Sequence, residues 1–401
     1  MHFIENNFKT IQFSAFFTAP DDLKVRAYRN VLPNVLTKTN DQFKTKLLLN
    51  EHLEHLYGAY FRQKIDKYAN QTVISITLTI PDPQIVKDKQ LFDQALALFK
   101  STIFDRKSLN EDVFHDEKRN TIELYESLKD RKRQYAQFKF FEHFFDHDND
   151  RVPLVGSLSD VKKMSFDGLM SYYDSVFSHD QIEIIVNGSL DDDMKQKVQN
   201  AFPMIKENTY QIKTKSRRLR ALKTVRDQIE TKQAIIMIGY VLPVFIKESL
   251  YEAAMLFDAI LGETPESRLF QKIREEKGLC YDVSSSYDGY KGVLIVHSGV
   301  SIEQKDEALK AMLELVDDMI KNHITDEELA SAKSYVSHMY KSNTDSQSAL
   351  TRRKFTSLIL NDPSTIDDRL ARIELVTKED IKKVMDLLVL DTIYMLEEEH
   401  D

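Results

Sequence analysis

The sequence has few of the residues that mark disulfide-rich, disordered or membrane proteins. Its 401 residues include one cysteine, Cys280, ten glycines and nine prolines. A single cysteine excludes an internal disulfide framework and fits a reducing compartment. The scarcity of glycine and proline, with 42% hydrophobic residues, indicates a globular chain and excludes a disordered one. No uncharged apolar run approaches the roughly 20 residues that a membrane helix needs, so we expect no membrane-spanning segment.

The charge distribution argues against a nucleic-acid partner. The formal net charge is −9, and acidic and basic residues are interspersed, whereas phosphate binding requires a net basic face. The first residues, MHFIENNFKTIQF, lack a basic stretch followed by an apolar one, so we expect no secretory signal. We therefore expect a soluble, cytoplasmic protein that binds neither nucleic acid nor a membrane.

The length of the chain predicts more than one domain. Residues 206–223 lie near its middle and are basic and polar, without the apolar periodicity of a helix. We interpret this stretch as a linker. It separates a predicted N-terminal domain, residues 1–205, from a predicted C-terminal domain, residues 224–401.

The two predicted domains repeat one pattern of helices and strands. In each half a helix ends at a glycine, Gly58 or Gly278, and two strands follow, at an offset of about 220 residues. Elsewhere the apolar spacing predicts a helix over residues 22–36 that is interrupted by Pro33, and one long charged helix over residues 108–145. The pattern predicts an α+β protein made of two similar halves.

One stretch of the second half, from Ser267 to Tyr290, places two polar side chains at a single turn. The helix runs to Gly278, which ends it as glycine does where the chain leaves the helical conformation. Tyr281 follows at the start of a polar strand, seven positions after Arg274. The guanidinium and the phenol are therefore placed to reach the same oxygen atom. The neighbouring Cys280 has no histidine or acid at a triad spacing, and we interpret it as a small packed thiol.

The run LGETPESRLFQKIREEKGLCYDVSSSY, residues 261–287, closely resembles a segment of the pitrilysin/insulysin superfamily, which includes the mitochondrial processing peptidase. Further matching stretches are VPLVGSLSDVKKMSF from Val152, NGSLD from Asn187 and ITDEELASAKSYV from Ile324, so the resemblance covers nearly the whole chain. It implies two similar α/β-sandwich domains that form half of a clamshell around a peptide-binding chamber.

The resemblance also implies a role for the polar pair. In that family the second domain supplies an arginine and a tyrosine at this spacing, which bind the substrate carbonyl and stabilise the developing oxyanion. Arg274 and Tyr281 are thereby implied as substrate-binding residues. The alternative is that Arg274 only pairs with Glu276 or another surface acid.

The zinc motif of the family is missing from this chain. Active members carry HxxEH, in which the two histidines bind zinc and the glutamate is the general base. The corresponding window, Arg29–Leu36, has no histidine and no acid, and Pro33 is expected to break the helix there. We therefore predict no metal site and no catalytic residue in this chain alone.

Two acids and two histidines resemble metal ligands without matching the motif. Glu117 and Glu123 fall near the family's distal acidic ligand, and without histidines we interpret them as helix-surface or core-edge acids. In the run EHLEH, Glu51 stands where the first histidine of the motif belongs. His52 and His55 are three positions apart, where the motif has four, and we interpret them as exposed helix residues.

Three functional hypotheses remain open. Bacterial members of the superfamily often occur as pairs in which one subunit carries HxxEH and the other keeps only the Arg/Tyr half, and this sequence resembles the second kind. The first hypothesis is a non-catalytic subunit that contributes Arg274 and Tyr281 to a zinc-bearing partner and acts on peptides or unfolded polypeptides. The second is a peptide-binding scaffold with no catalysis in any assembly. The third is an autonomous metallopeptidase that uses His52 and His55.

Overall fold

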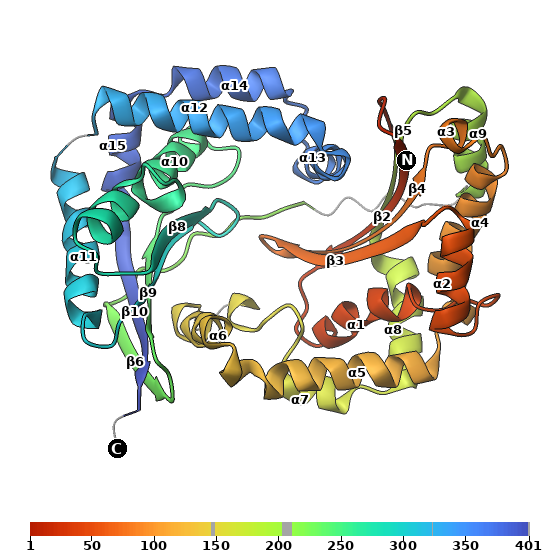
Figure 1. The fold of residues 1–401 in the computed structure, drawn as a ribbon, viewed down its shortest axis with the longest axis horizontal. Helices are drawn as coiled ribbons and strands as arrows, with labels where there is room; N and C mark the ends of the chain where they lie inside the picture. Colours follow the sequence, from red (N-terminus) through yellow and green to blue (C-terminus); the bar gives the residue numbers. More distant parts are fainter. Residues whose placement is uncertain (146–148, 203–210, 323, 400–401) are drawn as a thin grey trace. The chain divides into compact units, whose positions relative to one another are not determined.

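The computed structural model describes residues 1–145, 149–202, 211–322 and 324–399 (Figure 1). The chain divides into two compact units, and each unit includes a segment from the other half of the sequence. Unit 1 comprises residues 1–126, 152–212 and 343–363, and unit 2 comprises residues 127–151, 213–342 and 364–401. The predicted domain boundaries at residues 205 and 224 stay a prediction, and residues 206–210 of the predicted linker lie outside the described part.

Unit 1 contains a five-stranded sheet with the strand order β1-β5-β2-β4-β3. Its strands are β1 (His2–Glu5), β2 (Thr10–Pro20), β3 (Tyr60–Tyr68), β4 (Gln71–Pro81) and β5 (Gln181–Gly188). Its helices are α1 (Arg26–Leu36), α2 (Lys46–His55), α3 (Pro83–Val86), α4 (Leu91–Phe104), α5 (Glu111–Glu126), α7 (Leu158–Lys163), α8 (Phe166–His179), α9 (Asp192–Ala201) and α13 (Gln347–Leu360). β1 and β5 pair in parallel, and the other neighbours are antiparallel.

Side chains alternate along β2 between the two faces of this sheet, and different helices pack on the two faces. Ile11, Phe13 and Phe17 point into the core that the sheet shares with α1, α4 and α8. The opposite face is covered by α13 (Figure 1). There the side chain of Gln347 donates to the carbonyl oxygens of Thr10 and Asn187, both at 2.8 Å. The ring of Phe355 on this helix also stacks on Phe16 of β2, with 4.2 Å between the ring centroids, so hydrogen bonds and aromatic packing together attach α13 to the sheet.

Unit 2 repeats this topology with the order β6-β10-β7-β9-β8. Its strands are β6 (Lys223–Ile229), β7 (Ala234–Val241), β8 (Asp282–Asp288), β9 (Val293–Val300) and β10 (Val389–Glu398). Its helices are α6 (Lys132–Phe144), α10 (Tyr251–Asp258), α11 (Lys305–Lys321), α12 (Asp326–Ser342), α14 (Ile366–Leu375) and α15 (Lys378–Asp386), with π-helices at Ala259–Glu263 and Phe270–Glu276. β6 and β10 pair in parallel, as β1 and β5 do in unit 1.

The predicted repeat and the predicted α+β fold with two similar halves are confirmed. Strands of the two units correspond one to one. The two glycine turns form the same backbone hydrogen bond, between residues that are 220 positions apart in the sequence. The amide of Gly58 donates to the carbonyl of Glu54 at 3.3 Å, and the amide of Gly278 donates to that of Arg274 at 3.1 Å. Both glycines have positive φ, +75° and +63°, which other residues rarely adopt. No atom lies within 4 Å of a Cβ built on either glycine, so conformation alone explains them.

Helix α6 belongs to the first half of the sequence but packs on the sheet of unit 2. Its side chains Ala136, Phe140 and Phe144 form an apolar cluster with the sheet residues Ile235, Met237, Val293, Tyr394 and Leu396. Arg217 and Arg220 of the predicted linker bind the end of this helix. The Arg217 guanidinium lies 4.2 Å from the Phe144 ring centroid, and Arg220 donates to the carbonyl of His143 at 2.7 Å. These cations complement the carbonyl end of the helix dipole.

Two predictions about helices are wrong. The long helix predicted over residues 108–145 is two helices, α5 and α6, joined through a 3₁₀ turn at Leu128–Asp130. Charge and apolar spacing did not reveal the break because both helices are amphipathic, while their apolar faces belong to different units. Pro33 lies inside α1 without ending it. The buried Val31, Leu32 and Val35 pack the helix against the core. This packing offsets the loss of the backbone hydrogen bond that proline cannot donate.

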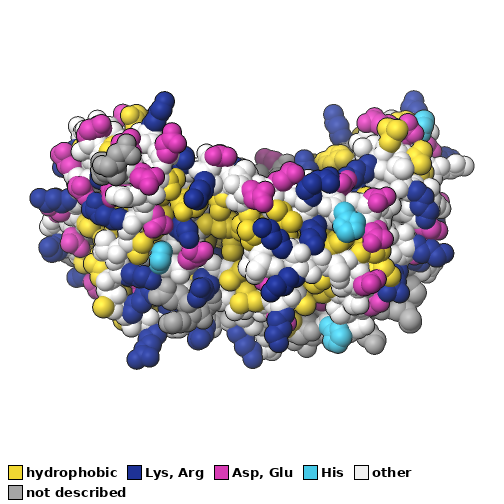
Figure 2. All heavy atoms as spheres, turned by 90° about the horizontal axis from the view of Figure 1, so that it is seen from below, with side chains coloured by type: hydrophobic (Ala, Val, Ile, Leu, Met, Phe, Trp, Pro, Cys, Tyr) yellow, Lys and Arg dark blue, Asp and Glu magenta, His cyan; other side chains and the backbone are white. Residues whose placement is uncertain are grey.

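The surface agrees with the charge pattern of the sequence. On the face drawn in Figure 2, lysine and arginine side chains lie among aspartate and glutamate side chains. Within the described part of the chain, no helix is long and apolar enough to cross a membrane.

Candidate functional site

The turn that carries Arg274 is a π-helix followed by a glycine. The segment Phe270–Glu276 buries only Ile273, and its other side chains are exposed or half-buried. The amide of Leu279 donates to the carbonyl of Ile273 at 3.0 Å, which closes the helix end around Gly278. π-helical turns are rare and are frequent at functional sites. The wider turn presents a charged side chain on a short, exposed segment.

The Arg274 guanidinium is held on one side and open on the other. It lies 4.5 Å from the ring centroid of Phe270, one turn earlier, which is a cation–π distance. Its one ion-pair contact among the described residues is a long one, 3.7 Å to the carboxylate of Glu275. The side chain is 41% exposed, so Glu275 leaves guanidinium donors available. The alternative from the sequence was that Arg274 pairs with Glu276 or another surface acid, and the acid that it contacts is Glu275.

Tyr281 combines an exposed side chain with an anchored main chain. Its amide donates to the carbonyl of Gly299 on β9 at 2.9 Å, while the residue is 61% exposed. The next residue, Asp282, is held at both ends. Its carbonyl accepts from the Ser298 hydroxyl at 2.8 Å, and its carboxylate pairs with Arg133 of α6. The phenol therefore projects from a fixed backbone, as a preorganised hydrogen-bond donor requires.

A histidine lies on the same strand pair as Tyr281. The hydroxyl of Ser284 on β8 is 3.0 Å from Nδ1 of His297, directly opposite on β9. Burial, and then the charge of Arg133, lower the pKa of His297, so its imidazole is neutral at pH 7. The half-buried thiol of Cys280 has a pKa raised by burial, which disfavours the thiolate that a nucleophile needs. Neither group points to catalysis in this chain by itself.

In unit 1, the window Arg29–Leu36, which corresponds to the zinc motif of the family, contains a buried arginine. Arg29 pairs with Asp180 at 2.7 Å and donates to the hydroxyl of Tyr172 and to the carbonyls of Phe17 and Thr72. Both charged side chains of the pair are buried. Burial raises the pKa of Asp180, against the opposing effect of the Arg29 charge. This position holds two strands and a helix together and offers no electron pair to a metal ion.

The acids near the distal ligand position do not form a metal site either. Glu117 on α5 is buried, and its carboxylate lies 2.9 Å from the ammonium of Lys38, just after α1. Glu123 is exposed and makes a 4.0 Å contact with Arg119. The interpretation of these acids as core-edge and helix-surface residues therefore agrees with their positions. Of these two acids only Glu117 is buried, and the cation of Lys38 compensates its negative charge.

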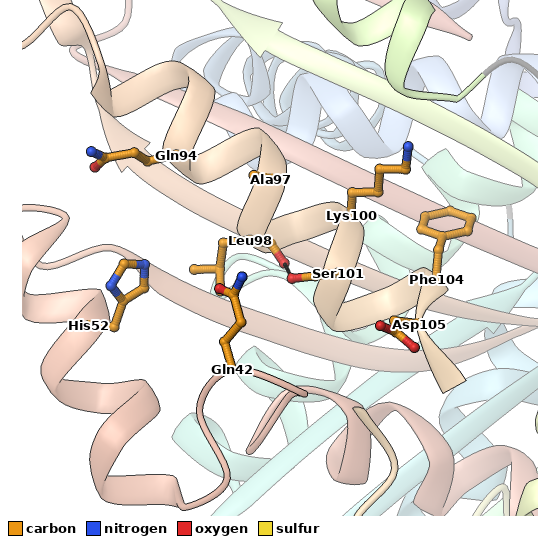
Figure 3. Close-up of a pocket in the computed structure, with 9 residues that line it drawn as sticks. All are labelled: Gln42, His52, Gln94, Ala97, Leu98, Lys100, Ser101, Phe104 and Asp105. Atoms are coloured by element: carbon orange, nitrogen blue, oxygen red, sulfur yellow. Dashed lines mark hydrogen bonds between the residues drawn. The ribbon is translucent and has the colours of Figure 1, made fainter. Parts of the chain in front are cut away.

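His52 and His55 lie on α2, and only His55 is exposed. His52 is half-buried and lines a groove of about 650 Å³ between α2 and α4 (Figure 3). Its ring stacks on Phe43 at 4.3 Å between centroids, and burial, with a smaller effect of His55, lowers its pKa. Among the residues that the structure describes, no group of three His, Cys, Asp or Glu side chains is placed to bind a metal ion.

One residue near the polar pair was missed from the sequence. Asp258, at the end of α10, is buried and accepts hydrogen bonds from the Ser285 hydroxyl at 2.5 Å and the Tyr287 amide at 2.8 Å. Both donors lie on β8, the strand that follows Tyr281. The signal was present, because Asp258 is the one charge in the apolar run LFDAILG.

Comparisons with known proteins agree with this geometry. Residues 163–336 match the family model described as Peptidase M16 inactive domain. The probable inactive metalloprotease YmfF of Bacillus subtilis is 26% identical over 97% of this chain and 93% of its own length. The uncharacterized zinc protease YmxG of the same organism is 28% identical over 37% of each chain.

Solved structures share the fold over the whole chain. A conserved protein from Enterococcus faecalis superposes with a TM-score of 0.88 at 23% identity, covering 100% of this chain and 96% of the other. A peptidase M16 inactive domain from Pseudomonas fluorescens superposes with a TM-score of 0.80 at 17% identity, covering 99% and 95%.

The chain is therefore a homologue of the M16 metallopeptidases, of the type described as inactive. This confirms the resemblance to the pitrilysin/insulysin superfamily that the sequence indicated. The residues of its metal window do not fit a zinc ion, because Arg29 is buried in an ion pair and the window contains neither a histidine nor an acid.

Proposed function

We propose that this chain is the zinc-less subunit of a heterodimeric M16 peptidase and supplies Arg274 and Tyr281 to the zinc site of its partner. One observation supports the proposal above the others. Both side chains are exposed on an anchored turn, whereas the matching window of unit 1 has no metal ligand. We infer that the complex is cytoplasmic, because the single cysteine fits a reducing compartment.

The two side chains suit the binding of a peptide carbonyl. When water adds to the carbonyl carbon, negative charge develops on the oxygen, and fixed donors stabilise it more than they stabilise the neutral substrate. The Arg274 guanidinium supplies charge and the Tyr281 phenol supplies a second donor. Zinc in the partner subunit would activate the water. The substrate would be a peptide or an unfolded polypeptide, because the donors contact main-chain atoms that every peptide has.

Peptide cleavage by the co-expressed heterodimer tests the proposal. The partner is a subunit that carries HxxEH. We expect Arg274→Ala and Tyr281→Phe each to lower kcat by about 100- to 1,000-fold, the usual cost of losing one oxyanion donor. The dimer should still form, because both side chains are exposed.

Two control variants remove side chains of similar chemistry and exposure from neighbouring or equivalent positions. Lys272→Ala removes an exposed cation from the same helix, and Tyr60→Phe removes an exposed phenol at the corresponding turn of unit 1. Both are expected to keep full activity. Full activity of both Arg274→Ala and Tyr281→Phe would refute the proposal.

A peptide-binding scaffold without catalysis is the second candidate function. The exposed phenol and guanidinium favour it as much as they favour an oxyanion site, because both can hold a peptide that is never cleaved. Binding of peptides by the pure chain, with no association to any HxxEH subunit, would support the scaffold.

The third hypothesis, an autonomous metallopeptidase, is tested by metal analysis. We expect the purified chain to hold less than stoichiometric zinc after dialysis, because His52 and His55 have no third ligand among the described residues. Inductively coupled plasma spectrometry measures the metal content. One zinc per chain that is lost in the double variant His52→Ala/His55→Ala would contradict this expectation.

A further inference from the structure

Asp258 connects a buried helix to the strand that follows Tyr281. It is the last residue of α10 and is 5% exposed. One carboxylate oxygen accepts from the Ser285 hydroxyl at 2.5 Å, and the other accepts from the Tyr287 amide at 2.8 Å. Both donors belong to β8, which lies next to β9 at one edge of the described sheet. These bonds therefore fix the side of β8 that faces α10.

The backbone just after Asp258 also contacts the helix that carries Arg274. A Cβ at Gly262 would lie 2.6 Å from the Ser285 nitrogen and 2.8 Å from the Leu269 side chain. Leu269 immediately precedes the π-helix Phe270–Glu276. The segment 258–262 is thus packed between the two elements that present Arg274 and Tyr281. A displacement of this segment would therefore act on both elements.

No cation faces the buried carboxylate among the described residues that interact with it. The titratable groups around Asp258 are Glu263 on the adjoining π-helix, Tyr335 on α12 and Tyr287 on β8. Helix α15 adds apolar side chains to the same core, and the α14 arginines pair with Glu252, at the other end of α10. Glu263 is an acid whose own pKa is raised by burial.

The neutral carboxyl fits this surrounding better than the charged one. Burial raises the pKa of Asp258 to about 7, although the hydrogen bonds from Ser285 and Tyr287 oppose the shift. In the neutral form the acid proton can be donated to the Ser285 oxygen. The Ser285 proton can then turn to the Asp258 carbonyl, which lies 3.3 Å away. All partners stay satisfied, and no unpaired charge is buried.

We propose that Asp258 is a positioning residue for the Arg274–Tyr281 turn and acts as a proton-sensitive latch, closed when its carboxyl is neutral and loosened when it is charged. The proposal rests on the proposed function, because it concerns the regulation of that same site. An acid with a raised pKa stabilises the closed form most below its ordinary pKa of 3.8. That stabilisation is lost as the pH rises to about 7 and is constant above it.

The only cysteine of the chain reports on the latch without a partner subunit. Cys280 is half-buried and adjoins Tyr281. Its alkylation rate is measured from pH 5 to pH 8.5 in the wild type and in Asp258→Asn. The ratio of the two rates removes the intrinsic pH dependence of the thiol. We expect this ratio to rise on the order of tenfold or more between pH 5 and pH 7 and then to level off, because one pKa unit corresponds to a factor of ten.

Three outcomes decide the proposal. A ratio that is flat with pH overturns it. Glu263→Gln is the matched control and should keep the rise relative to Asp258→Asn. If Glu263→Gln removes the rise instead, the latch is wrongly assigned to Asp258. If Asp258→Asn does not fold, Ser285→Ala serves in its place and should increase Cys280 reactivity at every pH, and an unchanged reactivity then overturns the proposal.

The heterodimer adds a second readout. In the complex with the HxxEH subunit, Asp258→Asn is expected to remove the pH-dependent loss of kcat between pH 5 and pH 7 that is specific to the wild type. Failure of the proposed function would appear as full activity of Arg274→Ala and Tyr281→Phe. That result would leave the Cys280 measurement unaffected, so the two failures can be told apart.

Discussion

Cutting the chain between residues 212 and 213 is expected to give two fragments that do not fold alone but recover the fold when mixed. The second fragment would retain the sheet of unit 2 without α6. Sheet residues that α6 covers would then face water, namely Ile235, Met237, Val293, Tyr394 and Leu396. At about 1.5–3 kcal/mol for each large buried apolar side chain, the loss is on the order of 10 kcal/mol. This equals the whole stability of a typical domain.

Size-exclusion chromatography and circular dichroism of the separate and mixed fragments measure this result. Phe140→Asp in the first fragment should abolish recovery, because Phe140 is fully buried and stacks on Phe144 at 4.9 Å. Gln137→Asp, on the exposed side of the same helix, should leave recovery intact. A second fragment that folds and stays monomeric alone would show that α6 is dispensable for unit 2.

Replacing Arg29 with methionine is expected to destabilise unit 1 by about 3–5 kcal/mol, because it leaves Asp180 buried without its counter-charge. The carbonyls of Phe17 and Thr72 and the hydroxyl of Tyr172 would lose a donor as well. The melting transition of unit 1 in calorimetry should fall on the order of 10 °C. A zinc motif therefore cannot be restored at this window without first replacing a structural ion pair.

A double-mutant cycle checks the cause of this loss. Adding Asp180→Asn to Arg29→Met should recover part of the stability, because it removes the buried charge. Arg62→Met removes an exposed arginine from β3 and should change stability by less than about 1 kcal/mol. If the double variant is less stable than Arg29→Met alone, the cost arises from the lost hydrogen bonds and not from the unpaired carboxylate.

The local features that were predicted correctly depend on short stretches of sequence. The alternation in β2 and β4 and the glycines at positions 58 and 278 determine strands and helix ends through nearest neighbours, so they could be read directly. The sequence did not reveal that α6, from the first half of the chain, belongs to unit 2 and that α13, from the second half, belongs to unit 1. Each helix buries one face, and the sequence of a helix does not show against which sheet that face packs.

Residues that act through distant partners were also misjudged or missed. The predicted linker contains Arg217 and Arg220, which bind the end of α6, and the linker interpretation gave them no partner. Pro33 was expected to end its helix, and burial of its neighbours keeps the helix intact. Asp258 was overlooked because its donors, Ser285 and Tyr287, lie almost thirty positions away.

The sequence by itself determined the family, the duplicated α+β architecture and the spacing of Arg274 and Tyr281. Each of these is written in residue order and needs no knowledge of which side chains meet. Only the tertiary structure decided that Arg29 pairs with Asp180, that Lys38 pairs with Glu117, and that a buried acid accepts hydrogen bonds from the strand that follows Tyr281. These facts depend on burial, and the free energy of a charge changes with its surroundings far more than with its neighbours along the chain.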